Sequence, residues 1–211
     1  MTTETPGLRE LKKQETRQLI SDRATHLFLE RGFEDTTIAD IAAAARVAKK
    51  TVTNYFARKE DLAFDRHEEF TAGLARTVAG RGAGESALAA LRAAFLAAAQ
   101  RHDPVIGFSG RAFAHMITES PTLTARLREL HELREAALAD VLAAETDAEP
   151  DDVTPRAVAA QLGAADRVLF GEVVRRTLGG QAGKAIAAAV TASARRVYDL
   201  LEPALGEYAV R

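Results

Sequence analysis

The first third of the chain carries apolar residues at helical spacing, divided into short segments. Apolar side chains recur three or four positions apart at Ile20, Ala24, Leu27 and Phe28. Gly32 then stands where a helix commonly ends, and Phe33 adds an apolar residue just beyond it. A first helix is therefore predicted to end near Arg31.

Two shorter helices are predicted next. Thr37 can cap the second helix, and Asp40, three positions later, completes an approximate capping box. The pattern breaks at residues 44–47, and a third helix is predicted from Lys49 to Tyr55. Its apolar residues, Val52 and Phe56, face inward at i and i+4, whereas Lys49, Lys50, Thr53 and Asn54 face outward. Two short helices joined by a tight turn describe a helix-turn-helix, whose second helix fits the major groove of DNA.

From Leu62 onward the sequence predicts further helices, because no alternation of apolar and polar residues is long enough for a strand. The fold class is therefore all-α. Glycine, proline and aspartate mark the boundaries. We expect residues 80–84 to end the fourth helix, Pro104, Pro121 and Pro155 to start the sixth, seventh and eighth, residues 179–180 to separate the last two, and Pro203 to end the ninth.

Composition agrees with a helical globular protein. The 211 residues are 47% apolar and 27% charged, and alanine, the best helix former, makes up about a fifth of them. The absence of cysteine excludes disulfides and thiolate zinc sites. We expect no secretory leader in the first eleven residues, no membrane segment, no metal and no cofactor, and a cytoplasmic location.

Charge is distributed unevenly although the formal net charge is only −2. Residues 41–59 contain five basic side chains and no acidic one, whereas residues 67–211 contain 16 basic and 19 acidic ones. A basic patch on a mildly acidic body is typical of a protein that contacts phosphate through one small surface. A solvated basic face is the alternative.

The helix-turn-helix region resembles the TetR family of transcriptional regulators. The matching residues occur in order and at the family's spacing over about 50 positions: Gly32-Phe33, Thr36-Thr37-Ile38, Ile41-Ala42, Ala45, Val47, Thr51-Val52, Asn54-Tyr55-Phe56 and Lys59-Glu60-Asp61-Leu62. The resemblance implies a nine-helix architecture. Residues 1–60 would bind DNA, and residues 61–211 would bind an effector and form a dimer.

The resemblance also implies the DNA contacts, which we assign to Thr37, Lys49, Lys50, Thr51, Thr53, Asn54, Tyr55 and Lys59. Lys50 and Asn54 are expected at base edges, and Tyr55 and Lys59 at phosphates. Two positions depart from the family pattern. Arg46 replaces a turn glycine, and Thr53 stands where the family often has an aromatic residue. Basic residues of the first helix, Arg17 among them, are further candidates for backbone contacts, unless they belong to a disordered tail.

An effector pocket is expected between the fourth and eighth helices, where the family keeps it. Our candidates are His67, Phe70, Phe95, Phe108, Arg111, His115, Met116 and Phe170. Each phenylalanine is also a candidate for the ordinary core. The histidines and the arginine stand out because a buried charge or imidazole needs a partner, although each could be exposed.

The last two predicted helices carry apolar stripes with more apolar surface than one small body needs. The stripes are Val158, Leu162, Ala165, Leu169 and Val173, then Ile186, Val190, Ala194, Val197 and Leu201. In the family these helices pair with their copies in a four-helix dimer interface. An intramolecular core is the alternative.

These features predict a regulator and no enzyme. No Glu-x-x-His repeat, zinc-protease helix, phosphate-binding loop or nucleophile elbow is present in the sequence. We expect a homodimeric repressor that binds a palindromic operator and is released by a small molecule. The alternative is a helical small-molecule-binding or interaction module without specific operator recognition, which Arg46 and Thr53 would favour.

Overall fold

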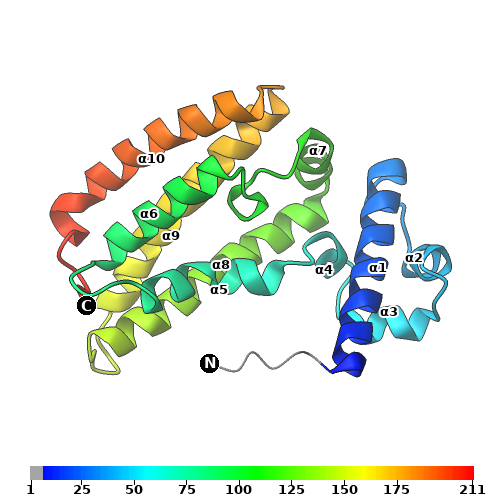
Figure 1. The fold of residues 1–211 in the computed structure, drawn as a ribbon, viewed down its shortest axis with the longest axis horizontal. Coiled ribbons are helices and arrows are strands. Elements are labelled where there is room, and N and C mark those ends of the chain that lie inside the picture. Colours follow the sequence, from blue (N-terminus) through cyan, green and yellow to red (C-terminus); the bar gives the residue numbers. More distant parts are fainter. Residues whose placement is uncertain (1–6) are drawn as a thin grey trace. The chain divides into compact units, whose positions relative to one another are not determined.

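The computed structural model describes residues 7–211, without the side chain of Leu8, and this part of the chain is entirely helical (Figure 1). It contains ten α-helices and one 3-10 turn: α1 (Leu8–Arg31), α2 (Ile38–Ala44), α3 (Lys49–Tyr55), α4 (Glu60–Ala63), α5 (His67–Ala79), α6 (Ala87–Gln100), η1 (Pro104–Ile106), α7 (Arg111–Glu119), α8 (Pro121–Glu145), α9 (Thr154–Leu178) and α10 (Gly183–Leu205). The predicted all-α class is confirmed. No helix among the described residues is long and apolar enough to cross a membrane.

The chain forms two compact units. Unit 1 comprises the chain up to His67 together with Met116–Thr124, and unit 2 comprises Glu68–His115 and Ala125–Arg211. Helices α7 and α8 therefore each contribute residues to both units. The division between a DNA-binding segment, 1–60, and an effector segment, 61–211, stays a prediction.

The predicted count of nine helices was one too low, because the expected fourth helix is two helices. α4 ends at Ala63, and Phe64 leaves the helical conformation with φ −109° and ψ 54°. Two side chains of α1 form hydrogen bonds with Asp65, in the segment between α4 and α5. Arg17 donates to the carbonyl of Asp65 at 2.9 Å, and Ser21 donates to the carboxylate of Asp65 at 2.7 Å.

Two boundaries in unit 2 also differ from the prediction. Pro104 starts only the 3-10 turn η1, and α7 begins at Arg111, because Gly107 and Gly110 adopt left-handed φ angles of 107° and 82°. Pro203 does not end α10, which continues to Leu205 with the proline inside its last turn. The starts of α8 and α9 and the glycine break before α10 are confirmed.

The predicted capping of α2 is confirmed. The backbone amide of Asp40 donates to the Thr37 hydroxyl at 3.2 Å, and the backbone amide of Thr37 donates to the Asp40 carboxylate at 2.9 Å. Hydrogen bonds from Thr37 lower the pKa of Asp40. These bonds satisfy helix-end amides, so they fix where α2 starts.

Unit 1 is a small helical assembly in which α1 packs against α2 and α4, and α2 packs against α3 (Figure 1). Its core is tightly sealed, because Ile20, Ile41, Val52 and Leu62 have no exposed surface. Phe33 packs on Phe28 with ring centroids 4.9 Å apart, which closes the end of α1. A rigid scaffold therefore positions the short helices α2 and α3.

The turn between α2 and α3 places a non-glycine residue in a left-handed conformation. Arg46 has φ 55° and an exposed side chain. Arg46 therefore adopts the left-handed conformation that a glycine would adopt in this turn. For an L-residue with a side chain this conformation costs about 1–2 kcal/mol, so the turn is strained.

We expect Arg46→Gly to raise the free energy of unfolding by about 0.5–1 kcal/mol. Relief of left-handed strain contributes about 1–2 kcal/mol and the greater flexibility of unfolded glycine removes about 0.5–1 kcal/mol. Urea denaturation measures the change. Ala43→Gly, in the regular part of α2, is the control and should lower the same quantity by about 1 kcal/mol. A loss of stability in Arg46→Gly would contradict the strain.

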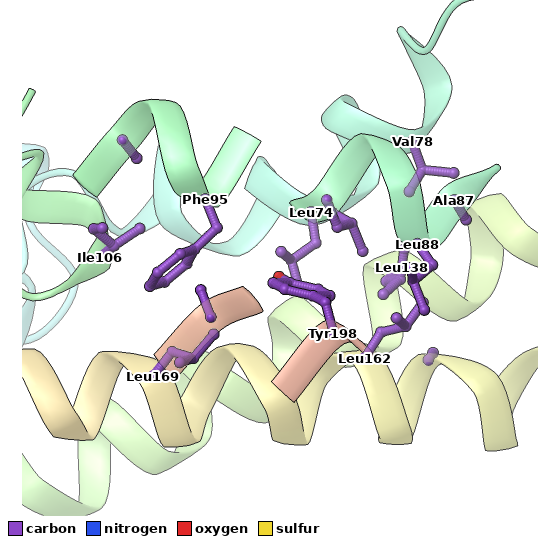
Figure 2. Packing of buried hydrophobic residues seen from close by; sticks show 14 of the residues in the cluster. Leu74, Val78, Ala87, Leu88, Phe95, Ile106, Leu138, Leu162, Leu169 and Tyr198 are labelled. Atoms are coloured by element: carbon purple, nitrogen blue, oxygen red, sulfur yellow. The ribbon is translucent and has the colours of Figure 1, made fainter. Parts of the chain in front are cut away.

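Unit 2 has its core where α10 packs against α6 and α9 (Figure 1). Tyr198 lies in the middle of it, 1% exposed, near Leu74 and Leu162 (Figure 2). The apolar stripes predicted for a dimer interface belong to this core: Val158, Leu162, Ala165, Leu169, Val173, Ile186, Val190 and Ala194 are buried, and Val197 and Leu201 are half-buried. Interpreting these stripes as surplus apolar surface was therefore wrong, since the chain buries them itself.

Candidate nucleic-acid interface

Helix α3 presents a polar outer face above a sealed inner one. Val52 is fully buried and Phe56 is 3% exposed, as predicted. Ala42 on α2 is also buried, and its small side chain lets the two helices cross closely. The outward residues are exposed: Lys49, Lys50, Thr53 and Asn54; Thr51 and Tyr55 are half-buried at the edges of this face.

The side chains on this face differ in whether they form hydrogen bonds within the protein. Within residues 7–211, the side chains of Lys49, Lys50 and Asn54 have no hydrogen-bond or ion-pair partner. The Thr53 hydroxyl donates to the carbonyl of Lys50 at 3.1 Å, which leaves its methyl group and its lone pairs outward. The free donors of Lys50 and Asn54 match the chemistry of base edges, where lysine pairs with guanine and asparagine with adenine.

Two other predicted DNA contacts are partly occupied. The Thr37 hydroxyl donates to the Asp40 carboxylate at 2.5 Å, so its proton is not free for a phosphate. The Lys59 ammonium lies 4.2 Å from the ring centroid of Phe33 and donates to the carbonyl of Glu34 at 3.3 Å. Burial lowers the pKa of Lys59. The phosphate roles of both residues stay predictions.

Sequence reasoning missed a polar network in unit 1 that includes the start of α8. Ser120 caps α8 by accepting from the amide of Leu123 at 3.1 Å, and its hydroxyl donates to the Glu34 carboxylate at 2.5 Å. That hydrogen bond lowers the pKa of Glu34, and Lys59 lowers it further. The network thus ties the segment before α2 to the first turn of α8. No local pattern indicates a pairing over 86 positions.

Arg17 has a structural role. Its guanidinium stacks over the ring of Phe56 at 4.6 Å while it donates to the carbonyl of Asp65. The arginine therefore connects the end of α3 with the segment between α4 and α5.

Comparison with known proteins agrees with this geometry. The profile of the bacterial regulatory proteins of the tetR family matches residues 20–65, and that of the MftR C-terminal domain matches residues 85–189. The HTH-type transcriptional regulator TcmR of Streptomyces glaucescens is 32% identical over 173 residues, which cover 79% of this chain and 76% of TcmR. This chain belongs to the TetR family.

Two further proteins extend the comparison. The HTH-type transcriptional repressor DhaR of Mycobacterium sp. (strain GP1) is 39% identical over 62 residues, 29% of this chain and 31% of DhaR. The SmeT–triclosan complex has the same fold with a TM-score of 0.54 and 20% identity, covering 86% of this chain and 90% of SmeT. TetR-family regulators bind operator DNA and small-molecule effectors, typically as dimers.

The eight effector candidates are divided between the two units, and their role in an effector site stays a prediction. His67 and Met116 belong to unit 1, whereas the other six belong to unit 2. Phe95 lies in the core of unit 2 (Figure 2), and His115 is exposed. Phe108 and Arg111 line one cavity, and Phe70 and Phe170 meet elsewhere with ring centroids 6.1 Å apart.

Sequence reasoning also missed the residue between those two phenylalanines. His131 of α8 meets both rings edge-on, at centroid distances of 5.1 and 5.3 Å. Burial, followed by the charges of Arg134 and Arg167, lowers the pKa of His131 to about 4. The imidazole is therefore neutral at pH 7 and behaves as a core ring. No group of three metal-ligating side chains occurs in the described part of this TetR-family chain.

Proposed function

We propose that this protein is a homodimeric repressor that binds a palindromic operator and leaves it when a small molecule binds. The observation that carries the proposal is the outer face of α3, where Lys50 and Asn54 stay unpartnered above the sealed core of Val52 and Phe56. An exposed helix with free base-reading groups on a rigid support is the arrangement that major-groove recognition needs. The name of DhaR, a repressor, supports the sign of regulation.

Dimerisation follows from the geometry of DNA. Two recognition helices can read a palindrome only when a dimer holds them one or more helical turns of DNA apart. We place the interface on α9 and α10, as the sequence analysis did, but on their outer faces. The outer face of α9 has small or apolar residues at helical spacing, Ala157, Ala164, Val168 and Gly171, and Leu200 of α10 is 79% exposed.

We expect Val168→Arg to convert the dimer to a monomer, because the substitution buries an unpaired charge in a closely packed interface. Val168 is 63% exposed in the single chain, so the substitution leaves the fold intact. Light scattering after size-exclusion chromatography measures the mass. Leu133→Arg, on an exposed position of α8, is the matched control and should remain dimeric. A dimeric Val168→Arg protein would exclude this face.

Release by a small molecule requires that effector and operator bind different states of the dimer. The two ligands then weaken each other reciprocally, with a coupling of about 1–3 kcal/mol. Triclosan in the SmeT complex supports an effector of small-molecule size for this chain. We propose that the protein acts in the cytoplasm, where its operator would lie, and that it is a regulator that catalyses no reaction.

The decisive experiment selects duplexes from a random pool and measures their binding by fluorescence anisotropy at several salt concentrations. We expect a palindrome that is bound at least about a thousandfold more tightly than random duplex. Lys50→Ala and Tyr55→Phe should weaken that binding, and Lys184→Ala, at an exposed position of α10, should not.

The second candidate is a helical binding module without operator recognition, which the strained turn at Arg46 favours. Weak binding with no preferred sequence, unchanged by Lys50→Ala, would support the module and refute the repressor.

A further inference from the structure

A cavity of about 450 Å³ opens in unit 2 beside the turn between α9 and α10. Its walls come from the loop that joins α6 to α7 and from the start of α10, and they include His102, Phe108, Arg111, Thr177, Gln181 and Gly183. The volume lies within the range of about 300–1,000 Å³ that small-molecule sites occupy. Phe108 and Arg111 are the two effector candidates that the structure brings together here.

One wall of the cavity is aromatic. The rings of His102 and Phe108 stack with centroids 5.0 Å apart and planes tilted by 30°. Gly183 lies under the imidazole, and a Cβ atom there would come within 3.4 Å of His102 Cε1. That distance is an ordinary van der Waals contact, so Gly183 packs closely against the imidazole. The two aromatic rings suit a planar ring as partner.

The loop that carries these rings contains two left-handed residues. His102 has φ 53°, which only glycine adopts readily, and Gly107 has φ 107°. A side chain at Gly107 would place its Cβ atom 3.1 Å from the carbonyl oxygen of Phe170. The left-handed His102 ends α6 in a Schellman motif, in which the amides of His102 and Asp103 donate to the carbonyls of Ala99 and Ala98, so this helix end fixes where the loop starts.

Another part of the cavity lining is positively charged. Arg111 is exposed, and its guanidinium has no hydrogen bond or ion pair within the described chain. No acidic residue lines the cavity: Asp103, in the same loop, accepts from the amide of Val105 at 3.0 Å, and Glu172 of α9 pairs with Arg175 and Arg176. A carboxylate on a ligand would therefore meet an unpaired cation.

Two helix N-termini add to this charge. α7 begins at Arg111 after Gly110, which has no side chain to cap it, and α10 begins at Gly183 without a side-chain cap. Neither helix has an acidic residue in its first turn. Uncapped amides and the positive end of the helix dipole favour anions.

We propose that this cavity binds a flat aromatic molecule that carries an anionic group. The ring lies on the His102–Phe108 wall, and the anion contacts Arg111 and the amides that start α7 and α10. That this ligand acts as the effector rests on the function proposed above, whereas binding itself does not.

Isothermal titration calorimetry of the full chain with 2-naphthoate tests the site, and 2-naphthamide serves as its neutral counterpart. We expect one naphthoate per chain. Arg111→Gln should weaken naphthoate binding by about 10- to 100-fold, which is the usual effect of one charge-assisted hydrogen bond. The same variant should leave naphthamide binding unchanged, and Phe108→Ala should weaken both ligands.

Arg156→Gln is the matched control, because Arg156 is an exposed arginine at the other end of α9, about 30 Å along the helix axis from Thr177. Its affinity for naphthoate should equal that of the unchanged protein. Thermal melting of each variant confirms that it is folded. The proposal fails if no binding of naphthoate is detected at concentrations up to about 1 mM. It also fails if Arg111→Gln and Phe108→Ala bind naphthoate with the same affinity as the unchanged protein.

A second measurement separates this site from the proposed function. Naphthoate should lower the affinity for the selected operator, and Arg111→Gln should abolish that effect. If naphthoate binds through Arg111 but the operator complex is unaffected, the site stands and its role as the effector site is overturned. If no operator is selected at all, the repressor proposal fails. The calorimetric measurement still decides whether the cavity binds naphthoate, because it does not involve DNA.

Discussion

Asn54→Ala is expected to lower the affinity for the selected operator at least about 30-fold. A bidentate contact to a base contributes about 1–3 kcal/mol, and a dimer on a palindrome loses it twice. Asn54 is exposed and bonds to no other described side chain, so the stability of the fold should stay within about 0.5 kcal/mol. Fluorescence anisotropy measures the affinity of the variant for the operator and for random duplex. Only the affinity for the operator should decrease.

Lys49→Ala provides the contrast. We expect Lys49, an exposed residue at the start of α3, to contact phosphate, so its loss should weaken binding to every sequence alike. It should also reduce the salt dependence of binding by about one phosphate per subunit. If Asn54→Ala instead weakened random duplex as much as operator, Asn54 would be a backbone contact, and base recognition would belong to other residues of α3.

The helix-turn-helix could be predicted from sequence because its signals are local. Thr37 and Asp40 lie three positions apart and form the predicted capping box. Val52 and Phe56 lie four positions apart and are buried as predicted. Each signal involves one helical turn, so it depends little on the rest of the chain.

The break between α4 and α5 could not be predicted in this way. The residues that hold it open, Arg17 and Ser21, lie 48 and 44 positions from Asp65. In a long run of good helix formers, such distant hydrogen bonds leave no periodic trace.

The body of the protein was harder to predict for a related reason. Periodicity identifies an apolar face of a helix but not the neighbour that covers it. Leu169 is covered by the chain's own core, whereas Val168, the next residue, is exposed. The effector candidates were harder to group for the same reason, because composition selects phenylalanine and histidine without indicating which of them meet, as Phe70 and Phe170 do.

A buried ion pair in unit 2 carries the largest expected effect on stability. Arg134 of α8 and Asp166 of α9 are each 4% exposed, and Arg134 Nη1 lies 3.0 Å from Asp166 Oδ2. The guanidinium also stacks over the ring of Phe70 at 4.5 Å, and its Nε has no hydrogen-bond partner among the described residues. Such a pair stabilises little as a whole, but removing one partner leaves a buried charge uncompensated.

We therefore expect Arg134→Ala to lower the free energy of unfolding by about 3–5 kcal/mol at pH 7, measured by urea denaturation. The double variant Arg134→Met and Asp166→Leu removes both charges and should be about as stable as the original protein or more so. If the double variant were as unstable as Arg134→Ala, lost packing on Phe70 would explain the effect and the charge would not.

The dependence on pH gives an independent check of the same cause. Burial raises the pKa of Asp166, and Arg134 and Arg167 lower it in part, so Arg134→Ala should raise it further. The native variant then holds a proton on Asp166 at pH values where the unfolded chain has lost it, and its stability falls as pH rises through that window. Lowering the pH from 7 toward the ordinary aspartate pKa should therefore recover part of the deficit.

Arg134→Ala should also raise the pKa of His131, because the charge of Arg134 contributes to the low pKa of its imidazole. This change also makes the deficit of the variant smaller at low pH. The native imidazole is neutral, so its contribution to stability is lost as pH falls from about 6.5 toward 4. Without Arg134 that acid loss becomes smaller. Repeating the measurement with His131→Phe in both proteins isolates Asp166. A deficit that stays constant with pH in that background would show that the Asp166 charge is not its cause.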